Sequence, residues 1–172
     1  VKRVCRELAL DEARWPPKQA QWYINSQKDE GLRAAHIEVP AGDQFGQTML
    51  QVYRAYELAC ERGGMVDFAE LLLRAHELWL KSPEVLQHYR GRFRQILVDE
   101  FQDTNTIQYA WLRVLAGKDI PVVAVGDDDQ SIYGWRGAKI ENIQRFADDF
   151  AGAKTVRLEQ NYRSPQTILH AP

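Results

Sequence analysis

The chain has 172 residues, of which 45 % are hydrophobic, and this share supports a packed core in one domain, or in one domain and a piece of another. No apolar run approaches about 18 residues, so no membrane-spanning helix is expected. Charged residues make up 27 % and the net charge is −2, which excludes the overall basic excess typical of DNA-binding domains but not a local basic groove.

Residues 1–92 are predicted to be helical. The Pro16-Pro17 pair begins a helix that stops near Gly31. Apolar residues at three-and-four spacing from Met49 to Ala59 predict a second helix, which ends at the glycines 63–64.

Two further helices in this half are predicted from their start signals. Asp67 and Glu70 form a capping box ahead of a helix with one apolar face. Ser82-Pro83 opens another helix.

Strands and helices alternate after residue 92. Short apolar runs at 96–98, 121–125 and 155–158 are predicted as buried strands, with helices from Thr104, over 140–150 and from Ser164. This order predicts a parallel sheet with helices on both faces. The expected fold class is therefore α/β, with a helical subdomain over 1–92 and part of an α/β domain over 93–172.

Two carboxylates, Asp99 and Glu100, follow the first strand. Open α/β sheets bind ligands at the carboxyl ends of their strands. One carboxylate can hold Mg²⁺ and the other can orient and deprotonate an attacking water, and phosphoryl transfer needs both functions. The alternative is that these acids only cap the next helix.

A polar loop follows the second strand, with three aspartates at 127–129. Like charges repel, so a bound cation or basic groups would be expected beside them. Gln130 can donate to a phosphate oxygen and accept from water. Tyr133, Trp135 and Arg136 form a set on which bases could stack, unless the aromatic rings simply pack on the core.

Arg163 follows the third predicted strand. Its guanidinium can stabilise charge on a transferring phosphoryl group. The alternative is a surface salt bridge to Glu159 or another acid.

Three strings together resemble motifs of the UvrD/Rep-type superfamily 1 DNA helicases. They are ILVDEFQDTN at 96–105, VGDDDQSIYGWRGA at 125–138 and QNYRS at 160–164. The motif-bearing match runs from about Met65 to Ser164, and details at Phe101, 108–111 and 134–136 look closest to one bacterial branch of the family.

This resemblance implies roles for single residues. Asp99 would bind Mg²⁺ and Glu100 would be the catalytic base. Gln130 and Arg163 would contact the γ-phosphate of ATP, and Tyr162 would pack on the adenine. The loop residues Tyr133, Trp135 and Arg136 would lie along single-stranded DNA.

The resemblance also implies an architecture and a partner. Residues 93–172 would be part of a RecA-like P-loop NTPase motor domain (1A-like), and residues 1–92 an inserted helical subdomain (1B-like). The parent protein would use ATP and Mg²⁺ to move 3′ to 5′ on single-stranded DNA, at single-strand/duplex junctions and with repair proteins as possible partners.

Cys5 and Cys60 match no zinc or disulfide pattern, which favours a cytoplasmic protein.

One departure from the family is large. The chain has no Gly-x-x-x-x-Gly-Lys-Ser/Thr loop, which cradles the triphosphate in P-loop proteins. We therefore expect a fragment that hydrolyses no ATP by itself, with an incomplete sheet edge that favours self-association. The alternatives are a stand-alone nucleic-acid-binding module that has lost hydrolysis, and an interaction module whose helical half contacts duplex DNA or repair proteins.

Overall fold

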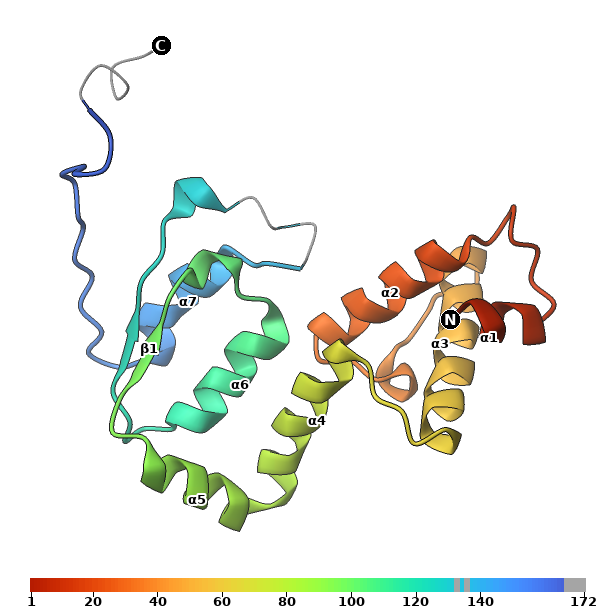
Figure 1. Ribbon diagram of the computed structural model, residues 1–172, viewed down its shortest axis with the longest axis horizontal. Helices are drawn as coiled ribbons and strands as arrows, with labels where there is room; N and C mark the ends of the chain where they lie inside the picture. Colours follow the sequence, from red (N-terminus) through yellow and green to blue (C-terminus); the bar gives the residue numbers. More distant parts are fainter. Residues whose placement is uncertain (132–133, 135–136, 166–172) are drawn as a thin grey trace.

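Five α-helices precede the first strand in the computed structural model, which describes residues 1–131, 134 and 137–165 (Figure 1). They are α1 (Lys2–Glu7), α2 (Pro17–Asp29), α3 (Gln44–Arg62), α4 (Phe68–Lys81) and α5 (Pro83–Arg92), with a 3-10 turn at Ala34–His36. The prediction of a helical amino-terminal half is confirmed.

The predicted start signals lie where these helices begin. Pro17 and Pro83 are the first residues of α2 and α5, positions at which proline loses no helical hydrogen bond. Asp67 caps α4 by accepting the backbone N–H of Glu70 at 2.7 Å. The reciprocal half of the predicted capping box is absent among the described contacts, because ion pairs engage the Glu70 carboxylate instead.

The first core lies among α1, α2 and α3. Its buried side chains come from all three helices, and the Tyr53 hydroxyl at its centre donates to the Leu32 carbonyl at 2.9 Å. The apolar members buried in this core are Val4, Cys5, Ala20, Ile24, Ala34 of the 3-10 turn, Met49, Leu50, Val52 and Tyr53.

The second half of the chain contains two short strands and two helices. β1 (Ile96–Val98) and β2 (Val122–Ala124) pair in parallel, with Val98 opposite Ala124. A 3-10 turn (Phe101–Asp103) and α6 (Thr106–Ala116) connect them, and a 3-10 turn (Asp128–Gln130) and α7 (Glu141–Asp149) follow. The described residues thus form a mostly helical protein with a small parallel two-stranded sheet.

The second core covers one face of this sheet. Phe101, Tyr109 and Leu112 are buried against the strands and α7. The other face is open within the described residues, since Leu97 is 73 % and Val123 is 44 % exposed. The expectation that helices cover both faces is therefore wrong for the part of the chain that the structure describes.

The third predicted strand, at 155–158, is also absent from the structure. Residues 151–163 are exposed and carry no regular secondary structure, with Val156 at 79 % and Leu158 at 89 % exposure. A strand exists only when a neighbour pairs with it, and among the described residues no strand lies beside this segment. The helix predicted from Ser164 extends into residues outside the described ranges.

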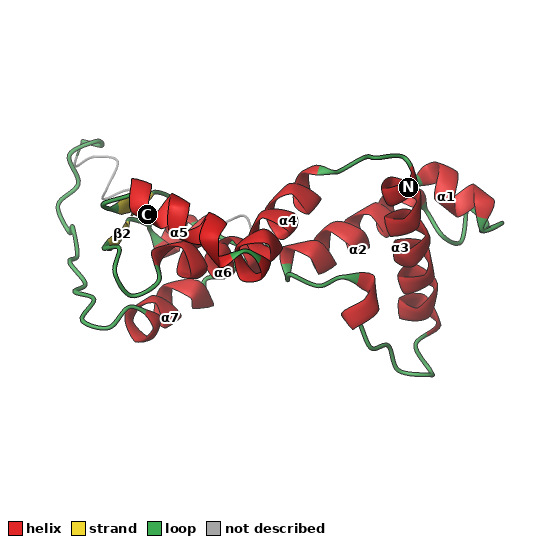
Figure 2. Ribbon diagram, turned by 90° about the horizontal axis from the view of Figure 1, so that it is seen from below, coloured by secondary structure: helices red, strands yellow, loops and turns green. Residues whose placement is uncertain are grey.

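Helix α4 lies between the two cores, as Figures 1 and 2 show. It packs on α6 through the rings of Trp79 and Trp111, whose centroids are 4.4 Å apart. Within the described part of the chain, no helix is long and apolar enough to cross a membrane.

Candidate functional site

The carboxyl ends of β1 and β2 form the centre of the candidate site. The parallel pairing continues past the strands, because Val125 donates its N–H to Val98 at 2.8 Å and Phe101 donates to Val125 at 2.9 Å. The residues that follow each strand are consequently held side by side. These are the acids 99–100 after β1 and the polar loop 126–130 after β2.

Asp99 and Glu100 leave the end of β1 in different ways. Both are exposed, and Asp99 accepts the backbone N–H of Glu100 at 3.0 Å through Oδ1. Glu100 has a φ of 50°, in the left-handed region that non-glycine residues rarely adopt. This backbone turn ends the strand and starts the 3-10 turn. The two acids do not cap α6, whose cap is Asn105.

The side chain of Gln102 joins the two strand ends. It is 1 % exposed, donates from Nε2 to Oε2 of Glu100 at 2.7 Å, and accepts the N–H of Asp127 at Oε1 at 3.1 Å. The sequence alone predicts no role for this residue. Its position three residues after Asp99 was visible, but its partner Asp127 is 25 residues away.

The polar loop stabilises its own charges. The Asp127 carboxylate accepts the N–H of Asp129 at 3.1 Å and the Nε2 of Gln130 at 2.6 Å. Donors within the loop therefore satisfy this carboxylate. Gln130, the predicted phosphate sensor, is exposed at the end of the 3-10 turn.

Tyr162 and Arg163, which were also predicted to belong to the site, are not brought to the strand ends. Tyr162 is 86 % exposed, and the backbone N–H of Arg163 donates to the Asn161 side chain at 2.8 Å. Within the described contacts, no hydrogen bond or ion pair joins Tyr162 or Arg163 to the residues after β1 and β2, nor Arg163 to Glu159. Three predicted DNA-binding residues, Tyr133, Trp135 and Arg136, lie outside the described residues.

A polar junction joins the end of α2 to the residues around this site. Asp29 accepts from Nδ2 of Asn105 at 2.9 Å, while Glu30 accepts the Thr106 hydroxyl at 2.9 Å and pairs with Lys139 at 2.8 Å. Burial, with a smaller contribution from Glu30, raises the pKa of Asp29 to about 6. The helical half is thus attached to the segment that follows the polar loop.

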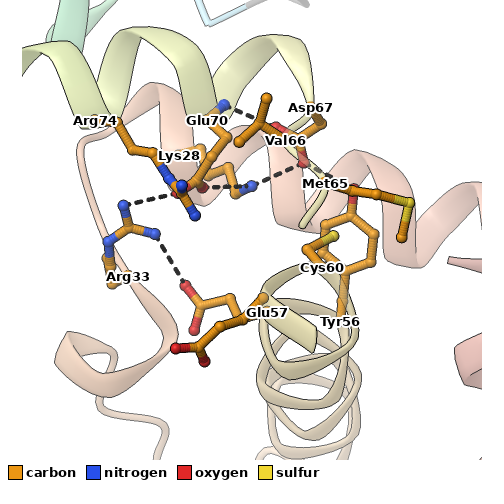
Figure 3. A pocket seen from close by; sticks show the side chains of 11 residues that line it. Lys28, Arg33, Tyr56, Glu57, Cys60, Met65, Val66, Asp67, Glu70 and Arg74 are labelled. Atoms are coloured by element: carbon orange, nitrogen blue, oxygen red, sulfur yellow. Dashed lines mark hydrogen bonds and ion pairs between the residues drawn. The ribbon is translucent and has the colours of Figure 1, made fainter. Parts of the chain in front are cut away.

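A second charged feature lies among α2, α3 and α4, where a cavity of about 260 Å³ opens beside buried ion pairs (Figure 3). The Nζ of Lys28, a residue only 2 % exposed, lies 2.8 Å from Asp67 and 2.9 Å from Glu70. Glu70 also pairs with Arg33 at 2.8 Å and Arg74 at 2.7 Å.

The charges of this cluster set the pKa of Glu70. Burial alone would raise it, but the hydrogen bonds from Arg33, Arg74 and Lys28 outweigh burial and lower the pKa to about 2. The charges of Lys28, Asp67 and Glu70 are paired, and these ion pairs tie α2 to α4.

The described residues contain no group of three or more His, Cys, Asp or Glu side chains that could hold a metal ion. A protein-built metal cage is therefore absent from this part of the chain. Mg²⁺ in phosphoryl-transfer sites is commonly held by one or two carboxylates together with water and substrate phosphates. The exposed Asp99 at the end of β1 fits that lighter form of coordination.

Comparison with known proteins gives a consistent result. The family described as the UvrD/REP helicase N-terminal domain matches residues 1–151. This match includes residues 1–64, in which no motif was identified from the sequence.

Individual relatives are similar over almost the whole chain. DNA helicase II of Escherichia coli is 67 % identical over 99 % of this chain and 24 % of its own length. DNA helicase II of Haemophilus influenzae is 57 % identical, over 99 % of this chain and 23 % of its own length. The ATP-dependent DNA helicase PcrA of Leuconostoc citreum is 41 % identical over the same shares. The chain thus spans about a quarter of the length of these relatives, and the predicted resemblance is confirmed.

Proposed function

Because the chain belongs to the UvrD/REP helicase N-terminal domain family, we propose that it is part of an ATP-dependent DNA helicase that moves 3′ to 5′ along single-stranded DNA. The names of its relatives, DNA helicase II and ATP-dependent DNA helicase PcrA, support this proposal. In this proposal the parent acts in DNA repair or replication, at single-strand/duplex junctions and alongside repair proteins. ATP and chromosomal DNA meet in the cytoplasm, which is the location we propose.

The proposed architecture has two parts. Residues 93–172 would belong to a RecA-like P-loop motor domain (1A-like), and residues 1–92 to a helical subdomain inserted into it (1B-like). The parallel order of β1 and β2, connected through α6, supports the first part. The separate core of α1, α2 and α3 supports the second.

One observation carries the proposed chemistry: the pairing of β1 with β2 brings an acidic strand end and a glutamine-bearing loop together. In this proposal Glu100 orients and deprotonates the attacking water. Gln130, in the loop after the neighbouring strand, contacts the γ-phosphate. Arg163 would stabilise charge on the transferring phosphoryl group and Tyr162 would pack on the adenine.

Asp99 is the residue that would hold Mg²⁺. Its exposed carboxylate suits an ion that keeps most of its water and phosphate ligands. When bound, the ion neutralises charge on the phosphates. The DNA-facing side would be formed by Tyr133, Trp135 and Arg136, on which bases could stack.

The chain alone is proposed to hydrolyse no ATP, because the 172 residues hold no Gly-x-x-x-x-Gly-Lys-Ser/Thr loop. The same observation favours one alternative, a stand-alone module that binds nucleic acid without hydrolysis. In that case the chain would bind single-stranded DNA and its acidic strand end would have no catalytic task.

The test places this chain in DNA helicase II of Escherichia coli, in exchange for the segment to which it is 67 % identical. We expect the chimera to show DNA-stimulated ATP hydrolysis, and Glu100→Gln to lower its kcat by about 10²–10⁴-fold, the usual size of general-base catalysis. The exposed Glu84→Gln serves as the control and should leave the rate unchanged.

Two results would contradict the proposal. One is a chimera in which Glu100→Gln hydrolyses ATP as fast as the unmodified chain. The other is an isolated 172-residue chain whose ATPase rate exceeds that of its own Glu100→Gln variant, because hydrolysis would then not require the missing loop.

A further inference from the structure

The side chain of Gln102 forms hydrogen bonds with residues that follow both strands of the candidate site. It lies in the 3-10 turn after β1 and is 1 % exposed. Burying an amide is costly unless its donor and acceptor are both satisfied. Here both are satisfied by functional segments of the site, which is unusual for a residue that merely fills space.

The two hydrogen bonds run in opposite senses. The Nε2 of Gln102 donates to Oε2 of Glu100 at 2.7 Å, and its Oε1 accepts from the N–H of Asp127 at 3.1 Å. Only a side chain with an acceptor and a donor on one planar group meets both demands at once. A carboxylate could keep the second bond but not the first, and a thioether could make neither.

The connection continues beyond Asp127. The carboxylate of Asp127 accepts from Nε2 of Gln130 at 2.6 Å. A continuous path of hydrogen bonds and one backbone unit therefore leads from Glu100 through Gln102 and Asp127 to Gln130. The two ends of this path are the residues that we propose act on the water and on the γ-phosphate.

Gly126 leaves the room that this arrangement needs. A Cβ at position 126 would lie 2.7 Å from Oε1 of Gln102 and 3.3 Å from its backbone nitrogen. Because real Cβ atoms do not approach other heavy atoms that closely, any side chain at 126 would displace the Gln102 amide. The segment after β2 can therefore lie this close to the Gln102 amide because residue 126 has no side chain.

The backbone conformation of Glu100 gives a second reason why the hydrogen bond from Gln102 matters. Its φ of 50° is an unfavourable conformation for a residue with a side chain. Such a residue keeps one position only when its surroundings fix it. The 2.7 Å bond from Gln102 is one of the contacts that fixes the carboxylate.

We propose that Gln102 is a positioning residue that holds the Glu100 carboxylate in register with the loop bearing Gln130, so that hydrolysis requires both strand ends in their joined arrangement. This inference rests on the proposed function, since it assigns Gln102 a task in the same reaction. Gln102 does not contact the substrate in this scheme. It acts through Glu100 and through the N–H of Asp127.

The two bonds can be separated by substitution in the chimera described above. Gln102→Met removes both bonds at similar volume. Gln102→Glu keeps an acceptor for the Asp127 N–H but removes the donor to Glu100. Gly126→Ala leaves Gln102 in the sequence and pushes its amide away. Gln108→Met is the matched control, because Gln108 accepts the N–H of Asn105 at 2.9 Å and caps α6 without contacting Glu100.

We expect Gln102→Met, Gln102→Glu and Gly126→Ala to lower the kcat of DNA-stimulated ATP hydrolysis by about 10- to 100-fold, the size of effect found for outer-shell groups that orient metal ligands. The KM for ATP should change by less than about threefold, because misplacement of a reacting group acts on the chemical step rather than on binding. The control should keep both parameters.

Amide hydrogen exchange distinguishes this task from simple packing. Protection of the Asp127 N–H should be lost in Gln102→Met and retained in Gln102→Glu, although both variants lose kcat. If Gln102 had only a structural task, kcat would fall only in those variants that also lose protection of the Asp127 N–H.

Two outcomes would overturn the inference. One is an unchanged kcat in Gln102→Met; the other is full activity in Gln102→Glu with the Asp127 N–H still protected. In either case a chimera that hydrolyses ATP and fails with Glu100→Gln would leave the proposed function intact. Loss of that baseline would instead count against the proposed function.

Discussion

Asp29 is a carboxylate held where its charge is disfavoured. Burial, and then the neighbouring Glu30, raises its pKa from the ordinary 3.8 to about 6. Its contact with Nδ2 of Asn105 at 2.9 Å ties α2 to the cap of α6. The folded chain therefore binds a proton at this residue more tightly than the unfolded chain does.

The sign of the effect on stability follows from this shift. Because the pKa is raised, the favourable contribution of Asp29 is complete below the ordinary pKa and is lost as the pH rises through about 6. Asp29→Asn should thus increase the free energy of unfolding near pH 8 by up to about 3 kcal/mol, and by little near pH 4. The asparagine oxygen can still accept from Asn105.

Urea unfolding of both chains at the two pH values measures this difference. Asp119→Asn, at an exposed aspartate, is the control and should change the free energy of unfolding equally little at both. A gain that is as large near pH 4 as near pH 8 would show that the charge of Asp29 is not the cause.

At the scale of elements, Lys28 ties α2 to α4. Its ammonium is almost fully buried between Asp67 and Glu70 (Figure 3). Leaving a buried charge without its partner costs about 3–5 kcal/mol. Without Lys28, Asp67 would lose its cation, whereas Glu70 would keep its other ion pairs. We expect Lys28→Met to lower the free energy of unfolding by about that amount.

The measurement is the urea midpoint of the 172-residue chain. Lys18→Met on the same helix provides the comparison, because Lys18 is exposed and surface substitutions change stability by about 0.5 kcal/mol or less. Equal midpoints for the two variants would mean that the buried ion pairs contribute nothing net.

The elements that could be predicted from the sequence are those fixed by local signals. Pro17, Asp67 and Pro83 each act within one helical turn, so the starts of α2, α4 and α5 were recognisable. The capping box of Asn105 and Gln108 was equally local and was overlooked. The segment 155–158 has a strand-like composition, but a strand also needs a neighbour, which no local pattern reveals.

The candidate site likewise contains residues that could be predicted from local sequence and contacts that could not. Asp99 and Glu100 were found because they directly follow an apolar run. The hydrogen bonds of Gln102 could not be predicted, because one of them depends on the N–H of Asp127 across the sheet. The reciprocal bond of Glu70 was predicted wrongly, because Lys28 and Arg33, distant in sequence, compete for its carboxylate.

At the scale of the whole molecule, the open face of the sheet is the surface on which we expect chains to associate. Leu97 and Val123 are exposed on it, and Val125 continues the apolar surface at 55 % exposure. Exposed apolar surface beside strand edges favours association between chains. We therefore expect the isolated chain to self-associate as its concentration rises.

Leu97→Lys should weaken this association. Burying a leucine side chain is worth about 1.5–3 kcal/mol, so the dissociation constant should rise by about tenfold or more. Sedimentation velocity over a range of concentrations measures it, with Leu80→Lys on α4 as the control at a similarly exposed leucine. A chain that sediments as a monomer at every concentration would rule out the sheet face as a contact surface.

The left-handed backbone at Glu100 has a consequence for how this chain can evolve. Glycine adopts that conformation without penalty, so stability alone would favour glycine at the position. A carboxylate there costs roughly 1 kcal/mol of folding free energy. Selection for thermal stability alone would favour replacing Glu100 by glycine. Selection for activity would keep the glutamate, and stabilising substitutions at other positions would offset its cost. Under the proposed function, stability and catalysis thus make opposite demands on the side chain at residue 100.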